Sequence, residues 1–153
     1  MGTPQSPGLI PRITSNLFDS IAEFSTPEDT CTVHISYFEI YNEQVRDLLA
    51  AQPQSFSSPE SKNSNGGLRV RERKDGAVFV EGLNEFQCKG FEDVLAFMKV
   101  GNKVRTTAAT MMNDTSSRSH AVFTICLRRF IKGATTEATV EKISRFRYSH
   151  CHH

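Results

Sequence analysis

Residues 31–41 read CTVHISYFEIY, and this stretch decides the fold class. It is rich in β-branched and aromatic residues, and apolar side chains occupy both of its alternating sets of positions. This pattern is typical of a strand that is covered on both faces. We therefore expect residues 31–41 to form a central strand. A second run of the same kind, residues 120–131 (HAVFTICLRRFI), predicts the last strand of the sheet.

Two segments around these strands predict helices. In residues 11–24 apolar side chains recur at helical spacing, and Pro11 stands where a first helical turn tolerates proline. Residues 91–105 repeat that spacing, with acidic side chains in the first turn and basic ones towards the end, as the helix dipole favours. The order of the elements predicts an α/β fold, in which helices flank a central, mainly parallel sheet.

Shorter elements are predicted between the first strand and the second helix. Residues 42–49 predict a short helix that Asn42 caps, and residues 50–67 predict a surface loop rich in Ser, Pro and Asn. Residues 68–82 predict a β-hairpin with its turn at Asp75-Gly76.

Length and composition limit the class of protein. With 153 residues, of which 38% are hydrophobic, the chain has room for one domain. Its apolar runs are too short to cross a bilayer, and its start lacks the features of a secretory signal, so we expect a cytoplasmic protein. Four cysteines without a CxxC pair predict free thiols, and common metal and redox motifs are absent from the sequence.

The charges are distributed unevenly along the chain. Residues 1–98 hold 8 Lys and Arg against 14 Asp and Glu, whereas residues 99–153 hold 10 against 3. A basic half can indicate an acidic partner, such as a phosphate ligand, a nucleic acid or an acidic protein surface. The fold can equally interleave the two halves, so charge alone leaves both interpretations open.

Residues 108–119 predict a polar loop, and its second half, with the start of the strand that follows, reads NDTSSRSH at 113–120. Hydroxyl groups can ligate Mg²⁺ or donate to phosphate oxygens, and an adjacent arginine can bind a phosphate or carboxylate through two nitrogens. On composition alone an ordinary Ser-rich turn is the favoured interpretation. A serine hydrolase is less favoured, because the sequence has neither a nucleophile elbow nor an evident Ser, His and Asp order.

The longer string changes this balance. Residues 107–120, TAATMMNDTSSRSH, closely resemble the switch I region of kinesin motor domains, whose pattern is N-x-x-S-S-R-S-H. Three further stretches occur in the kinesin order, namely GLIPR at 8–12, SYFEIYNEQVRDLL at 36–49 and GNK at 101–103. The stretches LRVRE at 68–72 and GNK at 101–103 resemble the kinesin-3 branch most. The resemblance implies a motor that couples ATP hydrolysis to movement along microtubules, in the cytoplasm and on the cytoskeleton, without nucleic acid or membrane as a partner.

The resemblance also implies roles for single residues. Ser117 matches the serine that meets Mg²⁺ and the γ-phosphate of ATP, and Ser116 matches the neighbour that helps to place the phosphate and the attacking water. Asn113 matches a polar residue of the same nucleotide pocket. Arg118 matches the arginine that forms a salt bridge with a switch II glutamate. Ser116, Ser117 and Arg118 are therefore the expected catalytic residues.

The predicted hairpin corresponds to a tubulin-facing loop of kinesins. By this resemblance Arg71, Arg73 and Lys74 would meet the acidic microtubule surface. The correspondence rests on position in the chain more than on a motif. A solvated hairpin tip is therefore an equally good interpretation of these three side chains.

Two family motifs are missing from the sequence. It contains no phosphate-cradling GxxxxGK[ST], and residues 146–153 (FRYSHCHH) stand where a strand leading to the switch II D-L-A-G-S-E is expected. We therefore expect a partial motor domain at 1–131 and a divergent, disordered tail at 132–153. The chain alone is expected neither to bind ATP and Mg²⁺ nor to hydrolyse ATP. The alternative is a non-catalytic truncated isoform that binds only tubulin or another partner.

Overall fold

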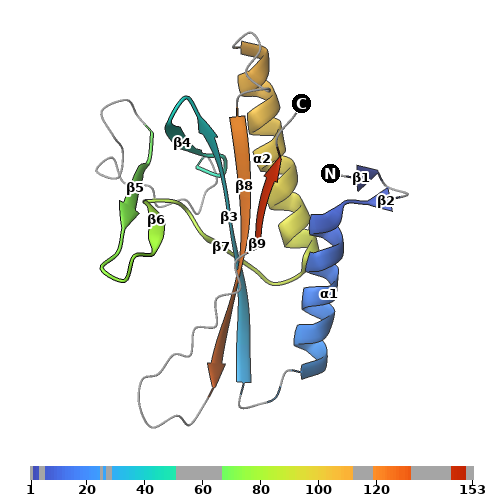
Figure 1. Ribbon diagram of the computed structural model, residues 1–153. Helices are drawn as coiled ribbons and strands as arrows, with labels where there is room; N and C mark the ends of the chain where they lie inside the picture. The colour runs from blue at the N-terminus through green and yellow to red at the C-terminus, as the bar shows by residue number, and fades with distance from the viewer. Residues whose placement is uncertain are drawn as a thin grey trace.

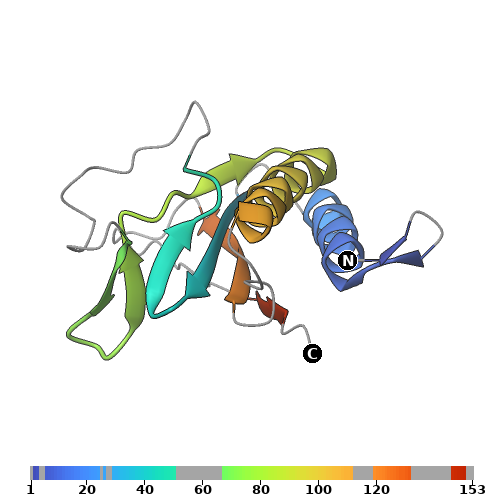
Figure 2. The same cartoon turned by 90° about the horizontal axis from the view of Figure 1, so that it is seen from above.

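The computed structural model of the chain describes residues 2–3, 6–24, 26, 29–50, 67–111, 119–131 and 146–150. Its centre is a pair of long antiparallel strands, β3 (Asp29–Tyr41) and β8 (Ser119–Ile131), joined along their whole length. Helices α1 (Leu9–Phe24) and α2 (Phe91–Met111) lie together on one side of this pair (Figures 1 and 2). The predicted α/β arrangement of a sheet with flanking helices is confirmed.

The other strands extend or surround this pair. Strands β4 (Gln44–Asp47) and β7 (Phe86–Cys88) both pair with β3, on the edge that β8 leaves free. Strand β9 (Phe146–His150) pairs with the outer edge of β8. Two small hairpins stand apart from the sheet, β1 (Gly2–Thr3) with β2 (Ser6–Pro7) and β5 (Arg69–Glu72) with β6 (Val78–Glu81). Strand β3 therefore has neighbours on both edges, which confirms the predicted central strand.

The prediction of a mainly parallel sheet is wrong for the part of the chain that the structure describes. Every strand pair there is antiparallel. The reason lies in how β7, α2 and β8 are connected. Strands β7 and β8 run parallel to each other, as the two strands of a crossover connection do, but β3 lies between them and runs against both. Helix α2 therefore joins two parallel strands, as in a βαβ unit, but these strands are not neighbours in the sheet.

The predicted short helix at residues 42–49 is also wrong. Asn42 and Glu43 both have positive φ angles, 47° and 60°, and form the two-residue turn of a β-hairpin between β3 and β4. Two left-handed residues give the turn a twist that matches the twist of the flanking strands. Burial alternates along β4, with Val45 and Asp47 buried, so these residues follow the period of a strand.

Other segments also differ from the predictions or lie outside the described residues. Helix α2 continues to Met111, past the predicted end at residue 105, so the predicted loop begins later than expected. Strand β9 lies within the tail that was predicted to be disordered. Most of the predicted loop at residues 50–67 lies outside the described residues, whereas the hairpin predicted after it is confirmed.

The hydrophobic core lies between the sheet and the two helices. Alternate residues of β3 and β8 face this core and are almost fully buried, among them Val33, Ile35 and Ile125. Leu17 and Phe18 of α1 pack against the same cluster. Burial raises the pKa of the Cys88 thiol to about 12, and the nearby Asp93 acts in the same direction, so this thiol is neutral at physiological pH. Among the helices described, none is long and apolar enough to cross a membrane.

Candidate functional site

The motif residues predicted for the nucleotide site lie between α2 and β8. Asn113, Ser116, Ser117 and Arg118 fall outside the described residues, so their expected roles stay predictions. The structure describes both ends of their segment, because α2 ends at Met111 and β8 begins at Ser119. The geometry of these two ends is what the structure adds to the motif.

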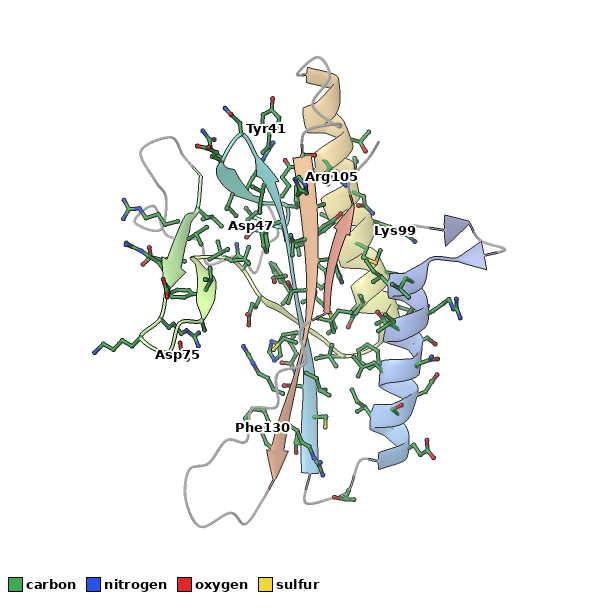
Figure 3. The ribbon with its side chains drawn as sticks, in the orientation of Figure 1. Tyr41, Asp47, Asp75, Lys99, Arg105 and Phe130 are labelled. Atoms are coloured by element: carbon green, nitrogen blue, oxygen red, sulfur yellow. The ribbon has the colours of Figure 1, made fainter. Side chains whose placement is uncertain are left out.

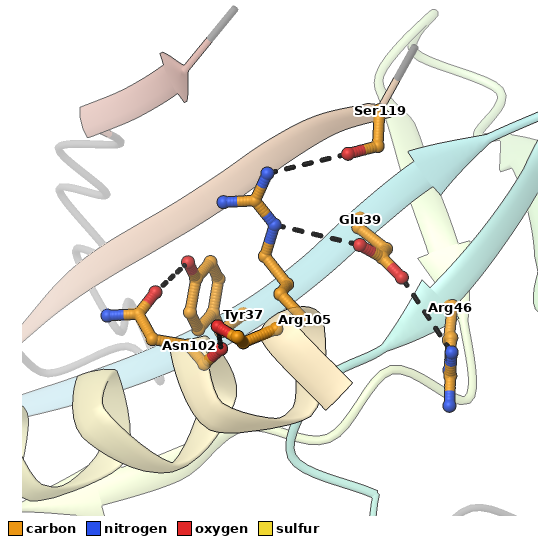
Figure 4. Close-up of polar contacts among 7 residues, drawn as sticks. Tyr37, Glu39, Arg46, Asn102, Arg105 and Ser119 are labelled. Carbon is orange, nitrogen blue, oxygen red and sulfur yellow. Dashed lines mark hydrogen bonds and ion pairs between the residues drawn. The ribbon is translucent and has the colours of Figure 1, made fainter. Parts of the chain in front are cut away.

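Arg105 connects α2 with the start of β8. It lies on α2, and its Nη2 donates a hydrogen bond of 3.4 Å to Oγ of Ser119, the first residue of β8 (Figure 4). Its Nε lies 3.6 Å from Oε2 of Glu39 on β3. The Arg105 and Glu39 side chains are only 13% and 9% exposed, so this ion pair is poorly screened by solvent. One guanidinium group therefore joins α2, β3 and the start of β8.

Glu39 lies between two arginines. Its second carboxylate oxygen, Oε1, is 3.9 Å from Nη1 of Arg46, the residue directly opposite it on β4. The Arg46 side chain is 57% exposed, so solvent weakens this contact. The pair with Arg105, whose side chain is far less exposed than that of Arg46, is the stronger of the two by this criterion.

A second polar contact lies one turn earlier on α2. The Tyr37 hydroxyl donates a hydrogen bond of 2.7 Å to Oδ1 of Asn102, and the Tyr37 ring packs edge-on against Phe123 at 5.2 Å between centroids. A Cβ atom on Gly101 would lie 2.1 Å from Cδ1 of Tyr37. The stretch Gly101-Asn102 therefore has a packing role, which is to let α2 approach the aromatic face of β3.

The three basic residues predicted to face microtubules share the exposed hairpin of β5 and β6, which projects from the sheet on the side away from the helices (Figure 3). Arg71 forms an ion pair with Glu81 on the opposite strand, at 3.1 Å. The Arg73 guanidinium lies over the Phe79 ring, 5.2 Å from its centroid. Lys74 lies in the exposed turn and has no ion-pair partner among the described residues. The structure thus places all three in one hairpin, where Arg71 and Arg73 already interact with other residues of the hairpin.

Both strands of this hairpin are attached to β4. Before β5, the Leu68 backbone N–H donates to the Val45 carbonyl at 2.8 Å. After β6, the backbone N–H and the side-chain amide of Asn84 donate to Oδ2 of Asp47 at 3.1 and 2.7 Å. The other oxygen of Asp47 accepts from the Leu49 N–H at 2.8 Å. This buried carboxylate fixes the base of the hairpin to the sheet.

Sequence reasoning missed Glu39, Asp47 and Arg105 as parts of the site. One signal was present, because Glu39 is an acidic residue within the otherwise apolar and aromatic run SYFEIY. Such a residue is rarely buried unless a partner neutralises it.

Among the residues that the structure describes, no group of three or more His, Cys, Asp or Glu side chains is placed to hold a metal ion.

The chain is similar to known proteins of one family. The family model described as the kinesin motor domain matches residues 1–147. The chain belongs to the kinesin motor domain family. The match continues beyond residue 131, where we had predicted the motor domain to end, and it includes the first residues of β9.

Several relatives are similar over most of this chain. Human kinesin-like protein KIF13B is 41% identical over 145 residues, which are 95% of this chain and 7% of that protein. Kinesin-like protein Klp98A of Drosophila melanogaster is 46% identical over 125 residues, which are 82% of this chain and 9% of that protein. The chain therefore spans less than a tenth of the length of these curated relatives. The KIF13 relatives confirm the predicted resemblance to the kinesin-3 branch.

Solved kinesin structures share the fold. The structure of a fast kinesin superposes with a TM-score of 0.70 and 36% identity, over 96% of this chain and 37% of that one. A KIF14 dimer with AMP-PNP in complex with a microtubule gives a TM-score of 0.67 and 38% identity, over 90% of this chain and 36% of that one. The chain thus corresponds to about a third of these solved motor chains.

Proposed function

We propose that these residues supply switch I and part of the microtubule-facing surface of a motor that couples ATP hydrolysis to movement along microtubules. One observation carries the proposal: the segment with the motif NDTSSRSH lies between α2 and β8, and Arg105 of α2 donates a hydrogen bond to Ser119 at the start of β8. Membership of the kinesin motor domain family supports it. Because the chain covers about a third of the solved motor chains, the activity concerns the complete motor domain.

The donor set of the motif suits a nucleotide with Mg²⁺. Hydroxyl oxygens are hard ligands of the kind that Mg²⁺ prefers, and an arginine and an amide can bind charged or polar groups beside it. ATP bound with Mg²⁺ would supply the phosphoryl group that water attacks. In this proposal Ser117 ligates the metal ion, Ser116 orients the water, and Asn113 contacts the nucleotide. Arg118 would form a salt bridge with a switch II glutamate, and the segment would order on the γ-phosphate and relax after its release.

The experiment that tests the proposal measures ATP turnover by the complete motor domain that contains these residues, with and without microtubules. We expect microtubules to stimulate turnover. Tight microtubule binding without any turnover would overturn the motor and support the alternative of a tubulin-binding module. Absence of both binding and turnover would overturn both.

The hairpin of β5 and β6 is the proposed contact with the acidic microtubule surface. Replacing Arg71, Arg73 and Lys74 together by alanine is expected to weaken microtubule affinity about tenfold at low salt, because each exposed charge contributes at most about 1 kcal/mol. Among the single variants, Lys74→Ala is expected to have the largest effect, since Arg71 and Arg73 already interact within the hairpin. Cosedimentation at several salt concentrations measures both effects.

Lys99→Ala is the matched control for the hairpin variants. Lys99 is an exposed lysine on α2, on the other side of the sheet from the hairpin (Figure 3). Its replacement removes the same charge and is expected to leave microtubule affinity within about twofold. Equal losses from Lys74→Ala and Lys99→Ala would indicate a general charge effect and would contradict a contact through the hairpin.

A further inference from the structure

Glu39 is an anionic side chain for which the proposed chemistry has no direct use. It is 9% exposed and lies on the face of β3 that looks towards α2, two residues after Tyr37. Helix α2 presents Asn102 and Arg105, one turn apart, to Tyr37 and Glu39 (Figure 4). A buried ion pair contributes little to stability when compared with apolar side chains of the same volume. The main contribution of the Glu39–Arg105 pair is therefore to fix the positions of the groups that it joins.

The start of β8 is held weakly by its backbone. Ser119 pairs with Tyr41 at the very end of the ladder between β3 and β8, and β9 reaches only as far as Ala121. Ladder ends open most easily, because a neighbour is missing on one side. The side-chain bond from Arg105 to Ser119 is thus an additional fastening at the point where the motif segment joins the sheet.

The direction of the Arg105 guanidinium depends on Glu39. Nε and Nη2 lie on the same edge of the planar guanidinium group, so pairing Nε with the Glu39 carboxylate also directs Nη2 at the Ser119 hydroxyl. Without the carboxylate, a long arginine side chain has several rotamers of similar energy and no reason to keep this direction. Ser119 directly follows Arg118 in the chain, so a displacement of Ser119 is passed on to the motif residues.

We propose that Glu39 is a positioning residue, which acts through Arg105 and Ser119 to fix the segment that carries Ser116, Ser117 and Arg118. This inference rests on the proposed function, since it assigns to Glu39 the placement of the switch I residues. Arg46, the other partner of Glu39, has no part in it, because it is exposed and contacts neither Arg105 nor Ser119 in the described structure.

The test uses the complete motor domain and two readouts. Glu39→Gln keeps the shape of the side chain and removes its charge, and Ser119→Ala removes only the hydroxyl that Arg105 contacts. Both variants are expected to lower kcat about tenfold and to change the microtubule concentration for half-maximal rate by less than about twofold, since misplacement affects the chemical step. Both are also expected to speed hydrogen exchange at the amides of Ser119–Ala121. The double variant is expected to be no slower than Glu39→Gln alone, because one path carries both effects.

Three further variants decide between the explanations. Arg46→Ala is expected to stay within about twofold of the wild type in kcat and in exchange, and Glu39→Asp is expected to recover part of the kcat lost in Glu39→Gln. If Glu39→Gln fails to fold, Ser119→Ala combined with Arg105→Lys gives the same comparison. Wild-type kcat in both Glu39→Gln and Ser119→Ala, beside a strong loss in Ser117→Ala, overturns this inference and leaves the motor proposal intact. Wild-type kcat in Ser117→Ala overturns the switch I role proposed for Ser117, on which this inference rests.

Discussion

Ser117→Ala is expected to lower the kcat of the complete motor domain for ATP by about 10²-fold, because the loss of one group that stabilises developing charge in a transition state commonly costs this much. The substitution removes one hydroxyl and leaves the contact between Arg105 and Ser119 in place, so the fold is expected to persist. Steady-state turnover with saturating microtubules measures the loss. Arg118→Ala is expected to act in the same direction, since it removes the salt bridge that closes the segment.

Thr115→Ala is the matched control, because Thr115 carries a hydroxyl at a position that the motif N-x-x-S-S-R-S-H leaves open. It is expected to keep kcat within about threefold of the wild type. A loss as large as that of Ser117→Ala would show that any change in this segment is harmful, and the assignment of Ser117 as a metal ligand would then fail.

The sequence predicts elements well where a local pattern decides them. The central strand follows from β-branched and aromatic residues at 31–41, and the hairpin of β5 and β6 follows from the alternation around Asp75-Gly76. The prediction of a short helix at 42–49 also came from a local pattern, because the spacing of Val45, Leu48 and Leu49 fits a helix. This prediction is wrong. The two positive φ angles at Asn42 and Glu43 override that spacing, since they turn the chain back onto β3.

Local sequence patterns cannot predict contacts that depend on the order of strands in the sheet. The sequence places Glu39 on a strand and Arg105 on a helix, 66 residues apart, and nothing local says that they meet. Their contact requires β3 to lie between β7 and β8, which is the same fact that makes the strand pairs antiparallel. The motif, by contrast, predicted the nucleotide residues without any geometry, because a family resemblance carries their roles together. Motif and geometry therefore supply different parts of the site.

The contact between α2 and β3 leads to the second large prediction, which is that Gly101→Ala destabilises the fold. Alanine is the better helix former by about 1 kcal/mol, so helix propensity alone predicts a gain in stability. The new Cβ, however, would lie 2.1 and 2.5 Å from two ring atoms of Tyr37, far inside the usual contact distance of about 3.5 Å between carbon atoms. Tyr37 is 5% exposed, packs edge-on against Phe123 and donates to Asn102, so its ring has little room to move.

Overpacking of a tight core costs about 1–3 kcal/mol and sometimes more, and loss of the Tyr37 hydrogen bond to Asn102 adds about 1 kcal/mol. These costs exceed the propensity gain, so we expect Gly101→Ala to lower the free energy of unfolding by about 2 kcal/mol. Urea denaturation measures this change. Gly90→Ala is the control, because a Cβ there meets no atom within 4 Å. Its cost is expected to be about 1 kcal/mol at most, as a change at a helix start. Gly101→Ala with unchanged or higher stability would mean that α2 and Tyr37 separate easily, and the close packing of α2 on β3 would then contribute little to the fold.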